Sequence, residues 1–155
     1  MTPIDRTDPV IMGHILSEHR ELFEQLSTLR TMLATESPPG CERLRELVRA
    51  IATLRRHLAD HFRQEETGGF LEEAVARMPR LGSAASDVLG QHPQLLGELD
   101  AIVARFGDAD VAPCADAWLE VHQAFEGFMR RMQEHERAEN AVVQQGYNED
   151  LGLDD

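Results

Sequence analysis

Two histidine–glutamate pairs with the same spacing are the part of this sequence best suited to chemistry. They are His61-x-x-x-Glu65 and His135-x-x-x-Glu139. Residues four positions apart lie on the same face of an α-helix, one turn from each other. If both segments are helical, the two side chains of each pair therefore project in the same direction. Imidazole nitrogen and carboxylate oxygen together are ligands that suit iron and related metals.

Two single histidines, His19 and His92, lie within apolar stripes of two further segments. Since the histidine–glutamate pairs also lie in apolar stripes, all of these side chains are expected to point into a core. Buried glutamates that face each other would repel, unless one binds a proton or a cation lies between them. Helix bundles commonly solve this problem with a di-metal carboxylate site. The predicted metal ligands are His19, His61, Glu65, His92, His135 and Glu139.

The elements that must position these residues are predicted to be helices. Apolar residues recur every three or four positions, and no run alternates as a β-strand would. The pattern predicts four long helices and one short helical turn, at about residues 9–34, 38–66, 70–78, 82–106 and 113–145. Ser37 is expected to cap the second long helix and Gly146 to end the fourth. Pro93 predicts a kink or break in the third.

Short connections between long helices predict an all-α fold, an up-down-up-down four-helix bundle. In this arrangement the start of one helix lies beside the end of the next. His19 and His92 lie near the starts of their helices, and the two pairs lie near the ends of theirs. All six predicted ligands then fall within about two turns of one another along the bundle, at ~1.5 Å per residue. We expect a single domain over residues 1–155, with the bundle at about 9–146 and a loosely packed acidic tail at 147–155.

The composition excludes several classes of protein. The chain has 155 residues, about one domain, with 42% hydrophobic and 28% charged residues, as in ordinary soluble proteins. A net charge of −13 repels phosphate backbones, so no nucleic-acid partner is expected. No apolar run is long enough for a membrane span, and the first residues do not resemble a signal peptide, so the cytoplasm is the expected location. Cys41 and Cys114 form no CxxC motif, and we expect small apolar fillers or surface thiols rather than a disulfide scaffold.

The order of these motifs resembles the hemerythrin-like family, also described as His-His-Glu cation-binding domains. The resemblance extends over about residues 10–145 and is carried by the stretches EHREL (18–22), HLADHFRQEE (57–66), QHPQL (91–95) and HERAE (135–139). It implies a four-helix bundle that holds two iron ions in a non-haem centre. In such a centre Glu65 and Glu139 would bridge the two ions, together with an oxo or hydroxo group. The resemblance also implies a small diatomic or peroxide ligand, and a monomer or homodimer.

The sequence departs from the oxygen carriers of this family at one position. Those proteins use five histidines, two of them one turn apart on the third helix, whereas Val88 and Leu96 lie one turn either side of His92 here. Two coordination positions would then stay open instead of one, which favours redox chemistry. His57, one turn before His61, could be a fifth ligand, a proton shuttle or a hydrogen-bond donor beside the site. Glu66 is expected to face solvent or a neighbouring helix.

These observations lead to a principal function and several alternatives. The chain is predicted to bind or sense O₂ or a related ligand such as nitric oxide or peroxide at a di-iron centre. The alternatives are an enzyme that reduces peroxide or nitric oxide, an iron-handling or storage protein, and a purely structural bundle. Manganese or zinc would suit similar ligands. Four aromatic residues are expected to form a dry core around the site, namely Phe23, Phe62, Phe125 and Phe128.

Overall fold

The computed structural model describes residues 9–34, 40–107 and 113–148, with the side chains of all of these except 9–19, 70 and 148. The elements in chain order are α1 (Pro9–Leu33), α2 (Cys41–Gly68), α3 (Phe70–Arg77), the short 3₁₀ helix η2 (Pro79–Leu81), α4 (Gly82–Phe106) and α5 (Cys114–Asn148). The predicted all-α fold is confirmed. None of the helices in these ranges is sufficiently long and apolar to cross a membrane.

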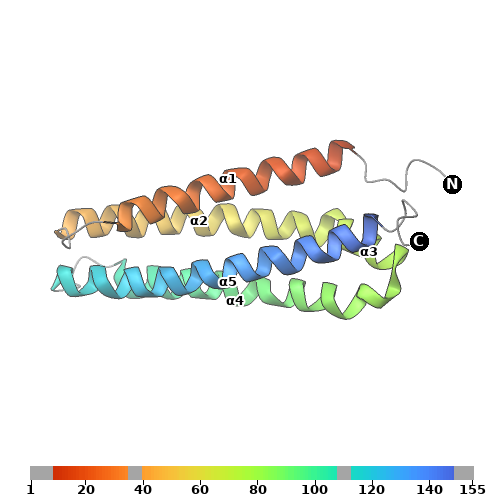
Figure 1. Cartoon of the computed structure of the whole chain (residues 1–155). Helices are drawn as coiled ribbons and strands as arrows, with labels where there is room; N and C mark the ends of the chain where they lie inside the picture. Colours follow the sequence, from red (N-terminus) through yellow and green to blue (C-terminus); the bar gives the residue numbers. More distant parts are fainter. Residues whose placement is uncertain (1–8, 35–39, 108–112, 149–155) are drawn as a thin grey trace.

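The four long helices pack as an antiparallel bundle (Figure 1). Along the chain α1 contacts α2, α2 contacts α4, and α4 contacts α5. Successive long helices run in opposite directions, so the start of α4 lies at the same end of the bundle as the end of α2. The short helix α3 covers this end and packs against α5. This topology is the predicted up-down-up-down arrangement.

Two predicted helix boundaries were wrong, and α4 has no break at Pro93. The N-cap of α2 is Gly40 and not Ser37, so the helix begins at Cys41. Pro93 does not break α4, which is continuous from Gly82 to Phe106. Pro93 is exposed, so the carbonyl that loses its hydrogen-bond partner lies on the solvent side of the helix. The second wrong boundary, at Gly146, is displaced because of a close helix contact.

Gly146 lies inside α5, where it faces α3. A Cβ atom at this position would lie 2.7 Å from the Cα of Ala74, closer than real Cβ contacts. Glycine is therefore required for the close approach of the two helices, and the helix continues to Asn148.

Tyr147 is buried and belongs to the bundle, which corrects the prediction of a loose tail from residue 147. Its hydroxyl donates a hydrogen bond to Glu73 Oε2 at 3.2 Å, and the guanidinium of Arg77 lies 4.4 Å from the centre of its ring. Burial and the negative charge of Glu73 raise the pKa of Tyr147 to about 12. Residues 149–155 of the predicted tail lie outside the described ranges.

A sharp turn at Gly69 joins α2 to α3. Its φ of +79° lies in the left-handed region that favours glycine. This residue ends α2 and precedes the first residue of α3, so the chain folds back across the end of the bundle immediately after Glu65 and Glu66.

The core consists of two hydrophobic clusters. The larger one contains residues of all four long helices, including Phe62 on α2, Leu95 on α4 and Met132 on α5. The smaller one lies among α3, α4 and α5 and includes Val88 and Val142. Along each helix the predicted ligands fall between these clusters or at the edge of one. These histidines and glutamates thus form a polar layer that separates the two apolar parts of the bundle.

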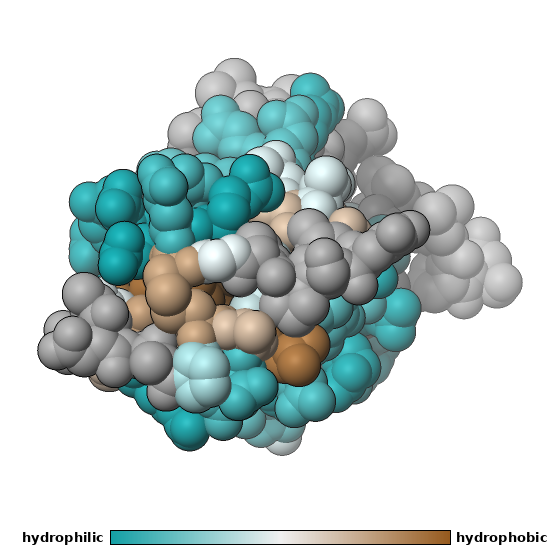
Figure 2. All heavy atoms as spheres, turned by 90° about the vertical axis from the view of Figure 1, so that its left-hand side faces the viewer, coloured by the Kyte–Doolittle hydropathy of each residue, from teal (hydrophilic) through white to brown (hydrophobic). Residues whose placement is uncertain are grey.

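Cys41 and Cys114 form a disulfide with a Cα–Cα distance of 5.2 Å, contrary to the expectation of separate thiols. These residues begin α2 and α5, so the bond joins two helix starts at the end of the bundle away from α3. Viewed from this end, hydrophobic residues lie at the centre of the end face and hydrophilic residues surround them (Figure 2). The pairing was not predicted because 73 positions separate the cysteines, and only the fold brings them together.

Three of the four aromatic residues that were predicted to form a dry core are buried, and Phe62 among them lies beside the predicted ligands. Phe62, Phe125 and Phe128 are fully buried. Phe23 is 53% exposed, because it lies on the solvent side of α1 next to the buried Leu22.

Candidate metal centre

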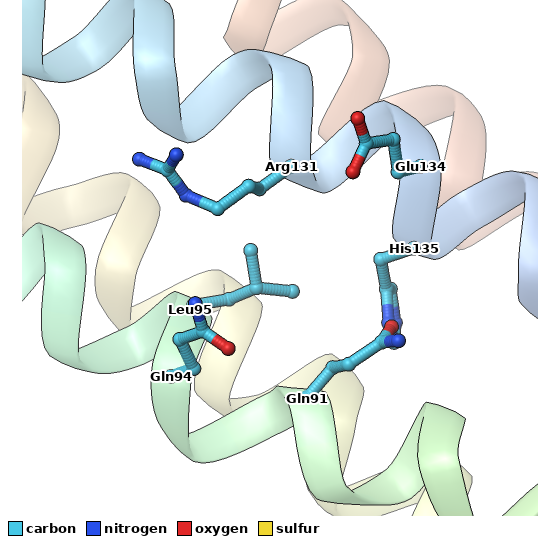
Figure 3. A pocket seen from close by; sticks show the side chains of 6 residues that line it. All are labelled: Gln91, Gln94, Leu95, Arg131, Glu134 and His135. Atoms are coloured by element: carbon cyan, nitrogen blue, oxygen red, sulfur yellow. The ribbon is translucent and has the colours of Figure 1, made fainter.

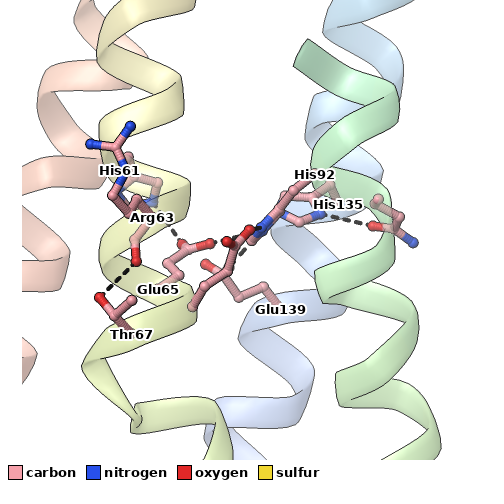
Figure 4. A network of polar contacts seen from close by, with 9 residues as sticks. His61, Arg63, Glu65, Thr67, His92, His135 and Glu139 are labelled. Carbon is pink, nitrogen blue, oxygen red and sulfur yellow. Dashed lines mark hydrogen bonds and ion pairs between the residues drawn. The ribbon is translucent and has the colours of Figure 1, made fainter. Parts of the chain in front are cut away.

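The structure brings five of the six predicted ligands to one level of the bundle, and all five are buried. They are His61 and Glu65 from α2, His92 from α4, and His135 and Glu139 from α5. His19 belongs to α1, but its side chain lies outside the described residues. Figure 4 shows the carboxylates and imidazoles converging on the space between α2, α4 and α5.

Four of these residues form a compact set. Each of Glu65, His92, His135 and Glu139 offers one ligand atom, and these atoms all lie within 4.8 Å of one another. His61 adjoins the set, with its Nε2 atom 2.7 Å from Glu65 Oε2. The other oxygen of Glu65 lies 3.1 Å from His92 Nε2, so this carboxylate lies between two imidazoles.

A hydrogen bond that His92 donates to Glu66 determines which nitrogen of His92 faces the cluster. Glu66 Oε2 lies 2.7 Å from His92 Nδ1. A carboxylate oxygen only accepts, so Nδ1 must carry the proton and donate. In the neutral ring Nε2 then presents its lone pair to the cluster, as a metal ligand would.

His135 is oriented in the same way by an uncharged partner. Its Nδ1 lies 2.8 Å from Gln91 Oε1, and a carbonyl oxygen also only accepts. The Nε2 atom of His135 therefore points its lone pair toward Glu139, whose Oε2 lies 3.8 Å away.

This arrangement requires a positive charge at its centre. In the neutral rings of His92 and His135, the Nε2 lone pairs face the oxygens of two buried carboxylates, and these groups repel unless a proton or a metal ion lies between them. Nitrogen and oxygen donors in a set of this kind suit a transition-metal ion. The donor set, its burial and its charge therefore fit a bound cation.

The same negative surroundings act on His92. Burial by itself lowers the pKa of this imidazole, but the hydrogen bonds and negative charges of Glu65 and Glu66 outweigh burial and raise the pKa above its ordinary value.

Phe62 forms an apolar wall beside the cluster. Its ring stacks on that of His92 with a centroid distance of 3.8 Å and an angle of 5° between the planes. The ring of His135 meets it edge-on at 5.4 Å. Phe62 therefore fixes the planes of both imidazoles and keeps water from this side of the cluster.

Sequence reasoning missed the roles of Gln91 and Glu66. Each is adjacent in sequence to a predicted ligand, and each contacts a histidine on the next helix around the bundle. Their position next to a predicted ligand was the available signal. Which histidine each of them contacts depends on how the neighbouring helices are aligned, and the sequence does not give this alignment. The suggestion that His57 ligates a metal receives no support, because His57 is exposed and its Nδ1 accepts a hydrogen bond from Gln25 on α1.

Comparison with known proteins agrees with this geometry. The chain matches the family described as hemerythrin, the hemerythrin HHE cation binding domain, over residues 10–143. Neither the curated proteins nor the solved structures gave a match. The matched region includes every buried His and Glu of the cluster and most of the length of the four long helices. The chain therefore belongs to the family of hemerythrin HHE cation-binding domains.

Proposed function

We propose that this protein holds a di-iron centre and uses it to bind or sense O₂ or a related small ligand such as nitric oxide or peroxide. The ligands of the two ions would be His19, His61, Glu65, His92, His135 and Glu139. Bound iron would supply the reversible binding or reduction of the small ligand. The protein would supply the orientation of the imidazoles, the bridging carboxylates and a dry surrounding.

The observation that carries this proposal is the set of four ligand atoms, from Glu65, His92, His135 and Glu139, within 4.8 Å of one another in the core. Two carboxylates and two imidazoles suit one ion. The proximity of His61 to Glu65 supports a second ion that shares this carboxylate.

A redox enzyme that reduces peroxide or nitric oxide is the second candidate. The observation that favours it is that α4 has Val88 and Leu96 one turn either side of His92. Neither side chain can bind a metal, so more coordination positions would stay open for a reacting ligand. Multiple turnover with an electron donor would distinguish this enzyme from a binding protein.

The first experiment is metal analysis with optical spectra of the purified protein, before and after reduction and exposure to O₂. About two irons per chain are expected, with near-ultraviolet bands that shift when azide is added. A stable oxygenated form would favour binding or sensing, and rapid oxidation would favour the enzyme. Failure to bind iron after anaerobic loading would refute the di-iron proposal, and preferential binding of zinc or manganese would correct the identity of the metal.

The assignment of the bridging carboxylates gives a first prediction. Glu65→Ala or Glu139→Ala should lose about half of the bound metal or more, because each carboxylate would contact both ions. Metal content per folded chain is the measurement, with helix content checked by circular dichroism. Glu46→Ala is the matched control, since Glu46 is exposed on the same helix as Glu65. Full metal retention in either site variant would show that the carboxylate is not a bridge.

A further inference from the structure

A small cavity adjoins the candidate metal centre between α4 and α5. Its volume is about 160 Å³, room for roughly five water molecules at ~30 Å³ each, or for one molecule of a few heavy atoms. Figure 3 shows the side chains that line it, which are Gln91, Gln94, Leu95, Arg131, Glu134 and His135.

His135 connects this cavity to the cluster. Its Nδ1–H donates to Gln91 Oε1 at 2.8 Å, and both residues form the cavity wall. The Nε2 atom, on the other side of the ring, faces Glu139. A molecule in the cavity is thus separated from the candidate metal centre by a single imidazole ring.

The charges around the cavity do not suit an anion. Arg131 Nε donates to Glu98 Oε2 at 2.7 Å, and Nη2 donates to Glu98 Oε1. These are the paired donors with which a guanidinium holds an anion, so Glu98 occupies them. Glu134 adds a second carboxylate at the rim.

Uncharged hydrogen-bonding groups are available in the same cavity. Gln91 and Gln94 each carry an amide that can both donate and accept. Leu95 provides an apolar wall, and its side chain is buried. The lining therefore suits a small neutral molecule better than a charged one.

We propose that this cavity is the access route by which a small uncharged ligand reaches the metal centre, and that Glu98 slows the entry of anions by occupying Arg131. This inference rests on the proposed function, because it requires a metal centre that binds such a ligand. The same charges would admit a cation, but a cation cannot bind to the metal ions themselves.

The test measures association rates of two probes with the metal-loaded full chain, by stopped-flow absorbance. Azide is the anionic probe and nitric oxide is the uncharged one. Glu98→Gln keeps the side-chain size and removes the charge that neutralises Arg131. The rate for azide should rise by about tenfold and fall again with increasing ionic strength, while the rate for nitric oxide stays at the wild-type value.

Glu120→Gln is the matched control for this substitution. Glu120 on α5 forms an ion pair with Arg105 on α4, with an Nη2–Oε1 distance of 2.9 Å, so the same two helices are involved. Neither residue lines the cavity. Wild-type rates are expected for both probes, and a rise in the azide rate equal to that of Glu98→Gln would refute a specific role for Glu98.

A second variant tests the route itself. Gln94 is exposed at the cavity, so Gln94→Trp should fill the space without disturbing the core. Both probes should then associate several-fold more slowly, with unchanged metal content. A wild-type azide rate in Glu98→Gln, or wild-type rates of both probes in Gln94→Trp, would overturn the inference. In that case, equilibrium binding of nitric oxide to the metal-loaded wild-type protein would show that only the proposed route is wrong. If nitric oxide does not bind at equilibrium, the proposed function is overturned as well.

Discussion

At the scale of single residues, the clustering of buried histidines and glutamates was predictable and their supporting contacts were not. The sequence spacing of His61 and Glu65, and of His135 and Glu139, follows from the helix repeat alone, and all four are buried together. The contacts of Glu66 with His92 and of Gln91 with His135 cross between helices. Such contacts depend on the relative shift and rotation of neighbouring helices, which helical periodicity does not specify.

The hydrogen bond between Glu66 and His92 gives a prediction at this scale. Glu66→Gln keeps the shape of the side chain but removes the charge that holds the Nδ1 proton of His92. Metal affinity should fall by about 10-fold or more, since partners of metal-bound histidines typically contribute that much. Competition with a chelator of known affinity measures the change.

Glu72→Gln is the control for this substitution. It removes the same charge from an exposed position on α3 and should leave metal affinity unchanged. Equal affinities of the Glu66→Gln and wild-type proteins would mean that the contact does not support the metal centre.

At the scale of the elements, the helices were predictable to within a few residues. The amphipathic pattern specifies which segments are helical, because burial of an apolar stripe is the main stabilisation of each helix. The ends were less predictable. Glycine commonly ends a helix, but Gly146 lies within α5 and allows close packing against Ala74. The same residue type ends α2, where Gly69 adopts a positive φ.

The contact between Gly146 and Ala74 gives a prediction for α3 and α5. Gly146→Ala should lower the free energy of unfolding by about 1–3 kcal/mol, because the added methyl group forces the helices apart. Denaturation by urea measures the change. In contrast, a Cβ atom at Gly97 on α4 would meet nothing within 4 Å. Gly97→Ala should therefore stabilise by roughly 0.5–1 kcal/mol, as expected for an open helix position, and equal effects of the two changes would contradict this account.

At the scale of the whole molecule, the topology could be predicted from the short connections, but the disulfide could not. Four helices with short links have few arrangements, and the up-down bundle is the simplest. Pairing of Cys41 with Cys114 requires that the starts of α2 and α5 are adjacent, which is a property of the complete fold.

Removal of this disulfide should lower the stability of the fold and leave metal binding unchanged. The Cys41→Ser and Cys114→Ser double variant should lose about 4 kcal/mol of stability, the loop-entropy value for this separation. Metal content should be unchanged, because His61 lies about 30 Å along α2 from Cys41. Thermal unfolding and metal analysis are the two measurements.

Reductant provides the control for the disulfide. It should lower the unfolding temperature of the wild-type protein and have no effect on the double variant. Loss of metal from the double variant would show that the two ends of the bundle are coupled.

The polar layer between the two hydrophobic clusters has a consequence for the life of the protein in a cell. A cation that binds only the folded chain stabilises it by mass action, by about 2.7 kcal/mol when its free concentration is 100 times the dissociation constant. Proteases remove chains in proportion to the fraction that is unfolded. A shortage of metal would therefore raise the fraction of unfolded chains and increase their loss to proteases.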